Sequence, residues 1–141
     1  MIRKIFGVLL TGVFVLMAGA CSSNNEWNEL SSPISAFVTR YFPFSVVQSY
    51  SKDKNVSTVI LKYGPKLTFN ASDVWLDVDG RGDVLPEDFL FDQLPDMLYD
   101  YLESMEELNM VYRVNRADRI IDVYLANDKV QYDELTMTIS E

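Results

Sequence analysis

The chain has 141 residues, with 21 acidic and 12 basic side chains, no histidine and one cysteine. Its formal net charge of −9 disfavours the binding of nucleic acid or of an anionic lipid surface through the bulk field, and it electrostatically favours a basic protein or peptide. Without histidine, and with the only thiol assigned below to a lipid, Ser-His-Asp and Cys-His catalysis and imidazole zinc sites are excluded. We therefore expect a protein that is not an enzyme and that needs no cofactor or metal ion.

The first 20 residues have the features of a secretory signal peptide. Arg3 and Lys4 precede an apolar run over residues 5–17, and the small residues 18–20 lead directly to Cys21. The run is shorter than the roughly 20 residues that span a bilayer. Small residues ending on a cysteine resemble the lipobox of bacterial lipoproteins, in which the thiol is diacylated. The resemblance implies lipid attachment at Cys21, and the alternative is a plain signal or an anchor with an incidental cysteine.

Residues 21–31 are polar and lack any periodicity. They predict a flexible tether that reaches about 30 Å between lipid and domain when extended. Ser22 stands where some bacterial lipoproteins carry an aspartate that retains them at the inner membrane. We therefore expect a lipid-anchored protein of the outer membrane, facing either the periplasm or the cell surface.

The first half of the domain reads as one helix followed by four strands. Ser32 and Pro33 predict a helix start, and Pro43 predicts its end. The apolar side chains between them recur at helical spacing and form one face. Alternating runs then predict four strands. These strands are expected over residues 46–52, 56–63, 66–70 and 74–78.

The segment from Asp77 to Asp83 interrupts this pattern with two glycines. Its acids and Gly82 loosely follow a calcium-binding loop, but Arg81 stands at a ligand position, which disfavours calcium. Residues 81–83 also spell the Arg-Gly-Asp tripeptide of integrin ligands. A solvated linker between two halves is the favoured interpretation.

The second half repeats the order of helix and strands. A helix is predicted over residues 92–105, where leucine, methionine and tyrosine side chains form an apolar stripe. The acids of this helix lie on the opposite face, either as a solvated surface or as a docking strip for a basic partner. Four more strands are expected over residues 108–114, 119–125, 129–132 and 135–139.

An internal repeat supports this division. The run from Val59 to Asn70 corresponds to the run from Val123 to Asp133, because both place apolar residues two apart on either side of a turn. This pattern predicts two hairpins, each with one buried face. We expect a single domain over residues 32–141 that consists of two units, 32–79 and 84–141. The predicted fold is α+β, with one shared antiparallel sheet and both helices on one face.

Several short motifs recur in a fixed order along the domain: Tyr41-Phe42-Pro43, the run Leu61 to Asn70, Asp73-Val74-Trp75, Leu85-Pro86 and Leu94-Pro95. Their order resembles the PepSY-like family of β-lactamase-inhibitor-like lipoproteins of Bacteroidetes. The resemblance covers roughly residues 32–139. It implies tandem helix-plus-strand units like those of β-lactamase inhibitor proteins, whose curved sheet grips a loop of the partner.

Strand alternation selects a candidate binding surface on the face of the sheet that is turned away from the helices. If the alternating apolar residues point inward, then Ile60 and Lys62 in one half, and Asp122 and Tyr124 in the other, point outward. We predict that these four residues bind a protein or peptide partner. Two alternatives stay open. One is an envelope hydrolase that uses paired carboxylates, and the other is a structural or assembly subunit of the outer membrane.

Overall fold

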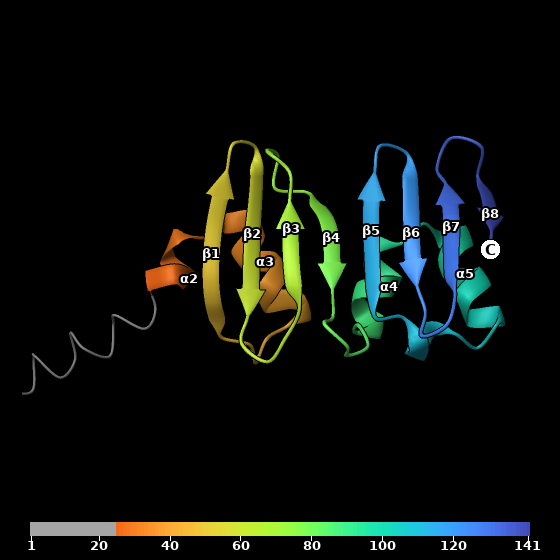
Figure 1. Ribbon diagram of the computed structural model, residues 1–141, viewed down its shortest axis with the longest axis horizontal. Helices are drawn as coiled ribbons and strands as arrows, with labels where there is room; N and C mark the ends of the chain where they lie inside the picture. The colour runs from red at the N-terminus through yellow and green to blue at the C-terminus, as the bar shows by residue number, and fades with distance from the viewer. Residues whose placement is uncertain (1–24) are drawn as a thin grey trace, which may run out of the picture.

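The computed structural model describes residues 25–141 as an eight-stranded antiparallel sheet with four α-helices and one 3-10 helix. The predicted α+β fold class is therefore confirmed. The elements in chain order are α2 (Asn25–Glu29), α3 (Ser32–Tyr41), β1 (Val47–Asp53), β2 (Val56–Leu61), β3 (Lys66–Phe69), β4 (Trp75–Asp79), α4 (Glu87–Gln93), α5 (Asp96–Ser104), η2 (Leu108–Met110), β5 (Arg113–Ala117), β6 (Ile120–Tyr124), β7 (Lys129–Asp133) and β8 (Thr138–Ser140). The helices α3, α4 and α5 lie on one face of the sheet, behind the strands in Figure 1, and α2 lies beside the edge strand β1.

The strands pair in chain order from β1 to β8, so every neighbour in the sheet is also a neighbour in the sequence. Both predicted hairpins form. Val59 of β2 pairs with Leu67 of β3, and Val123 of β6 pairs with Val130 of β7. All four of these side chains are buried, as alternation requires of a sheet with one covered face. The pairing of β4 with β5 joins the two halves into one sheet.

The core fills the space between the sheet and the helix layer, and Phe89 of α4 lies at its centre. This side chain is fully buried, and its ring packs edge-on against Phe37, Tyr41 and Trp75, with centroid distances of 5.9, 5.6 and 5.6 Å. Edge-to-face contacts of this kind are favourable because the positive ring edge meets the negative ring face. Because these partners come from α3 and β4, Phe89 connects the helix layer of both halves to the sheet.

The predicted flexible tether is wrong for its last residues. Residues 25–29 form the helix α2, Leu30 is buried, and Trp27 packs against the core. The two apolar residues explain the difference, because they remove enough surface from water to dock a five-residue helix that is too short to be stable alone. The predicted signal peptide over residues 1–20 and the lipid attachment site Cys21 lie outside the described residues.

The helix predicted over residues 92–105 is two helices, α4 and α5, which begin five residues earlier and break at Leu94-Pro95. The break follows from proline, which disfavours helical geometry in the preceding residue and lacks an N–H donor. Leu94 is accordingly extended, with φ −84° and ψ 147°.

Two of the predicted strands also have wrong bounds. Residues 108–110 form the 3-10 helix η2, and β5 extends to Ala117 instead of ending at residue 114. The last strand is only Thr138–Ser140, because the carboxylate of Asp133 accepts the N–H groups of Leu135 and Thr136 and holds a turn there.

Candidate binding face of the sheet

The helix-free face carries the side chains that alternate with the buried ones. Register places the outward residues in rows that cross the strands. One row contains Ile60, Lys66, Asp79, Arg113, Tyr124 and Lys129, which are successive cross-strand partners. With neighbouring strands about 4.8 Å apart, Ile60 and Tyr124 lie about 19 Å from each other. Residues from both halves therefore belong to one continuous surface.

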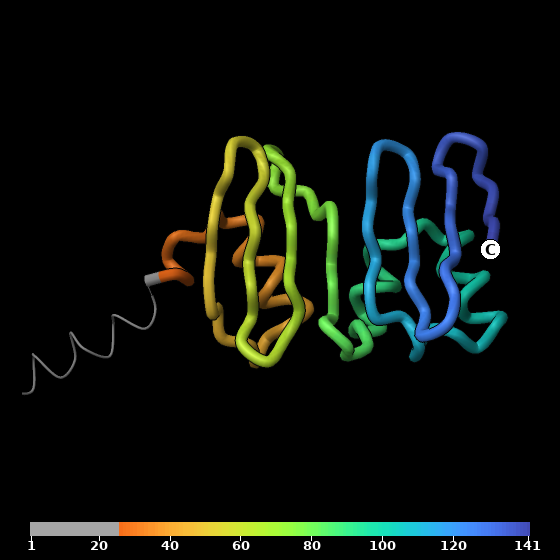
Figure 2. Tube along the Cα trace, viewed as in Figure 1, coloured from red at the N-terminus to blue at the C-terminus, as the bar shows by residue number. Residues whose placement is uncertain are grey.

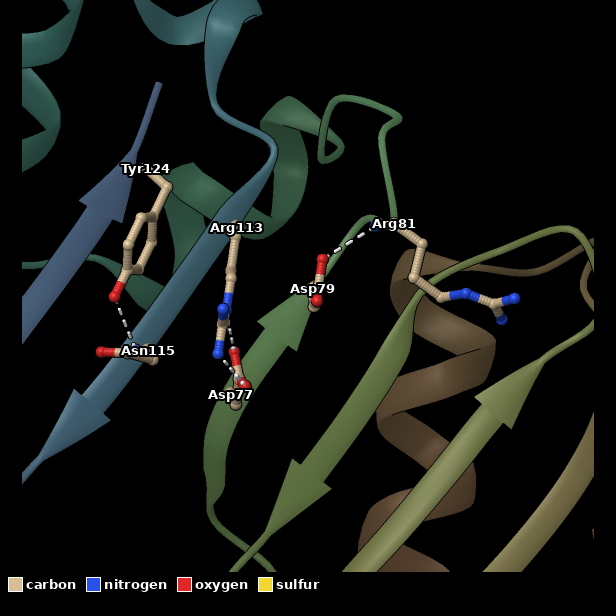
Figure 3. Close-up of polar contacts among 6 residues, drawn as sticks. All are labelled: Asp77, Asp79, Arg81, Arg113, Asn115 and Tyr124. Atoms are coloured by element: carbon tan, nitrogen blue, oxygen red, sulfur yellow. Dashed lines mark hydrogen bonds and ion pairs between the residues drawn. The ribbon is translucent and has the colours of Figure 1, made fainter. Parts of the chain in front are cut away.

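An ion pair between Arg113 and Asp77 lies at the junction of the two halves (Figure 3). Arg113 Nε and Nη2 donate to the two carboxylate oxygens of Asp77 at 3.0 and 2.8 Å. These hydrogen bonds outweigh the opposing effect of partial burial and raise the pKa of the Arg113 guanidinium. The two-pronged geometry orients the arginine across β4 and β5.

Tyr124 of β6 is held in place by the same group of residues. The Arg113 guanidinium carbon lies 5.1 Å from the centre of the tyrosine ring, within the range of a cation–π contact. The Asn115 side-chain amide donates to the tyrosine hydroxyl at 3.1 Å (Figure 3). The ring is thus fixed on the surface, half-buried, with its orientation determined by two strands.

Asp122 continues this set of contacts toward β7. Its Oδ1 accepts a hydrogen bond from Gln131 Nε2 at 2.9 Å and lies 3.7 Å from Lys129 Nζ. The polar groups from β4 to β7 consequently have partners within the face, so a ligand that binds there meets pre-oriented side chains.

The structure places three of the four predicted partner-binding residues on this face. Ile60, Asp122 and Tyr124 are half-buried and alternate with buried neighbours. Lys62 is different, because β2 ends at Leu61 and Lys62 lies exposed in the following turn. Its backbone N–H donates to the Val46 carbonyl there, at 2.8 Å.

Sequence reasoning missed the centre of the face, which is formed by Asp77, Arg113 and Asn115. The signal was present, because Arg113 and Asn115 flank the buried Val114 in the alternating pattern of a strand. The strand predicted over residues 108–114 ended before Asn115, and the pairing of Arg113 with Asp77 depends on the contact between β4 and β5.

Two of the three carboxylates in the segment from Asp77 to Asp83 are engaged by the protein itself. Asp77 binds Arg113, and Asp79 Oδ1 accepts the Arg81 backbone N–H at 2.9 Å (Figure 3). Within residues 25–141, no group of three or more histidine, cysteine, aspartate or glutamate side chains is arranged to hold a metal ion.

Two shallow clefts lie away from this face. One, of about 270 Å³, is lined by Glu87, Glu103, Glu106, Leu108 and Asn109. Glu87 accepts a hydrogen bond from the Tyr99 hydroxyl at 3.1 Å, and the tyrosine pKa is raised by burial and by this contact. The other, of about 190 Å³, lies at one end of the sheet and is lined by Tyr63, Gly64, Gly80, Arg81 and Asp83.

Solved structures with the same fold come from Bacteroides. A candidate periplasmic protein of the DUF2874 family from Bacteroides vulgatus ATCC 8482 is 20% identical, with a TM-score of 0.66 over 81% of this chain and 90% of that one. A second B. vulgatus candidate periplasmic protein, of unknown function, has the same identity and TM-score over 83% and 96% of the two chains. A candidate calcium-regulated periplasmic protein from Bacteroides thetaiotaomicron is 19% identical, with a TM-score of 0.66 over 81% and 90%.

At this level of identity the likeness establishes the fold. No family model and no curated protein sequence matches the chain. Within the described part of the chain, no helix is long and apolar enough to cross a membrane.

Proposed function

We propose that the protein is a non-catalytic, lipid-anchored binding protein of the bacterial cell envelope, and that its helix-free sheet face holds a protein or peptide partner. The observation that carries this proposal is the row from Ile60 to Tyr124. It brings two large side chains from different halves onto one surface, with a pre-oriented polar group between them. Tyrosine and arginine are enriched at protein interfaces, where rigid side chains lose little entropy on binding.

The envelope location is supported by the fold relatives and by the N-terminal sequence. Three structures with this fold are candidate periplasmic proteins. The run of small residues before Cys21 supports lipid attachment at that thiol. The formal charge of −9 supports a partner with a basic surface, which it would attract over a range of about 10 Å at moderate salt.

We further infer that the two halves are PepSY-like units. The support is that each half places four antiparallel strands after its helices, and that the hairpins of both halves bury equivalent residues. A shared sheet solves a size problem, because a single helix with four strands covers too little apolar surface for a stable domain.

Site-specific photo-crosslinking in intact cells tests the binding face. A photoreactive phenylalanine analogue at Ile60 and, in a second strain, at Tyr124 should capture the same partner, because the two positions lie in one row. The matched control is Met97, a 45% exposed residue of the helix layer, which should not capture it.

The variant that combines Ile60→Asp with Tyr124→Asp should lose the complex, whereas Ser51→Asp, at the exposed edge of the same face, should keep it. Equal capture from Met97, or an undiminished complex in the double variant, would contradict the proposal.

Fatty-acid labelling in cells tests the anchor. The wild-type chain should incorporate a labelled fatty acid, and Cys21→Ser should not, because the acyl chain is carried by the thiol. Label retained in Cys21→Ser would mean that the lipid is attached elsewhere.

A further inference from the structure

Three segments meet at one end of the sheet and form a surface that we name the loop edge. They are residues 42–46 before β1, residues 62–65 between β2 and β3, and residues 80–86 between β4 and α4. Figure 2 shows them at the lower end of the same view. Arg81 Nη1 lies 3.5 Å from the carbonyl oxygens of both Leu61 and Gly64, which connects the third segment to the second. The Lys62 N–H donates to the Val46 carbonyl at 2.8 Å, which connects the second to the first.

The loop edge presents more exposed apolar surface than the helix-free face. Phe44 is 99% exposed and Tyr63 is 91% exposed, while Val46 and Val84 are each 58% exposed. Tyr63 has a φ of 55°, a left-handed conformation that bulky side chains seldom adopt. Among residues 25–141, six other non-glycine residues also adopt this conformation, so the exposure of the ring, not its backbone, carries the argument for a binding role.

Cations accompany these aromatic side chains. Lys62 Nζ lies 5.5 Å from the centre of the Tyr63 ring, and Arg81 lines the cleft beside the same tyrosine. The only carboxylate within the three segments is Asp83. Aromatic rings flanked by lysine or arginine are typical of surfaces that lie at the boundary between lipid headgroups and acyl chains.

The short segment between Cys21 and α2 indicates that the loop edge binds the lipid bilayer. Only four residue steps separate Cys21 from Asn25, where α2 begins, and they span at most about 14 Å. An acyl chain on Cys21 would therefore hold the folded domain against the bilayer, and some part of its surface must face the headgroups. This step rests on the lipid anchor proposed above.

We propose that the loop edge docks on the phospholipid surface, with Phe44 and Tyr63 inserted among the headgroups and with Lys62 and Arg81 on lipid phosphates. In this orientation the sheet is perpendicular to the membrane plane. Its helix-free face is then not covered by lipid and stays open to a protein partner. The exposed acids Asp96 and Asp100 belong to α5 in the helix layer, whereas Glu103, at the end of that helix, lines a cleft with Glu87, the residue that follows the loop edge.

Quenching by brominated lipids tests this orientation in the intact lipoprotein. The full chain is expressed with its signal, purified and reconstituted into vesicles of phosphatidylethanolamine and phosphatidylglycerol with brominated acyl chains. Tyr63→Trp is the reporter at the loop edge. Leu135→Trp is the matched control, because Leu135 is also a turn residue, is 71% exposed and lies at the opposite end of the sheet. The parent protein supplies the background of Trp27 and Trp75.

We expect the tryptophan at residue 63 to be quenched at least about threefold more than the one at residue 135, since interfacial side chains reach the region about 5–10 Å deep. A Val84→Trp reporter should also be quenched, and should lose most of that quenching when Phe44 and Tyr63 are both replaced by serine. Equal quenching at residues 63 and 135 would overturn the proposal. Blue-shifted but unquenched emission at residue 63 would also overturn it, because a protein would then cover the edge.

Fatty-acid labelling of the same preparations separates the two proposals. If the chain is labelled but its reporter at residue 63 is not quenched, the docking proposal is contradicted and the anchor proposal is retained. If the chain is not labelled, the anchor proposal is contradicted, and so is the docking proposal that rests on it.

Discussion

The two faces of the sheet use their side chains in opposite ways. On the covered face, the strand residues that alternate inward are apolar and almost completely buried, and they pack against α3, α4 and α5. On the helix-free face, polar and charged residues pair with one another across the strands. Apolar burial is the dominant stabilising contribution to folding, while partly exposed ion pairs contribute little. The comparison indicates that the covered face maintains the fold, whereas residues on the other face can change with little loss of stability.

Replacement of Phe89, the central core residue, should have the largest effect on stability. Phe89→Ala is expected to lower the free energy of unfolding by about 3–5 kcal/mol, because it removes a fully buried ring and leaves a cavity between the two halves. Urea unfolding followed by circular dichroism measures this. Phe91→Ala, in the same helix but at a 65% exposed position, should cost less than about 1 kcal/mol. Similar losses for both variants would contradict the assignment of Phe89 to the centre of the core.

The ion pair of the helix-free face should contribute less to the free energy of unfolding than Phe89 does. A double-mutant cycle with Arg113→Met and Asp77→Asn is expected to give a coupling energy of about 1 kcal/mol, because the two side chains are still 35% and 25% exposed. The coupling should decrease in 1 M salt, which screens exposed charges. A coupling of several kcal/mol, comparable to the loss of Phe89, would mean that both faces stabilise the fold.

The smallest expected effect concerns Asp133, also on the helix-free face. Burial tends to raise its pKa, but the N–H groups of Thr136 and Leu135 and the charge of Arg119 outweigh this effect and lower it. A lowered native pKa favours the folded state above the unfolded pKa of about 3.9, and this contribution is lost as the pH falls through the native pKa. Asp133→Asn should therefore flatten the decrease in urea midpoint between about pH 4 and pH 2.5. An unchanged acid slope in the variant would show that Asp133 does not stabilise the turn before β8.

The parts of the fold that depend on local patterns could be predicted from the sequence. The hairpins β2–β3 and β6–β7 formed as expected, because alternation with period two identifies the buried face without knowledge of the rest of the chain. For the same reason Ile60, Asp122 and Tyr124 were placed on the helix-free face, whereas Lys62 was not, since one residue beyond the end of β2 the alternation no longer applies.

Contacts between distant segments required the tertiary structure. Arg113 and Asp77 are 36 residues apart, and their pairing depends on the register between β4 and β5, which the packing of the intervening α4 and α5 helps determine. The docking of α2 likewise depends on core surface that exists only after the sheet has formed, because so short a helix is unstable alone. Exposure itself is a property of the folded chain: Phe37 and Phe44 are the same residue type seven positions apart, yet the first packs on Phe69 and Phe89 while the second is almost entirely in solvent.

The sequence by itself therefore determined the fold class, the hairpins and the face of most strand residues, because these follow from local periodicity. The central ion pair, the docked N-terminal helix and the exposed aromatic side chains of the loop edge were decided by which distant surfaces meet.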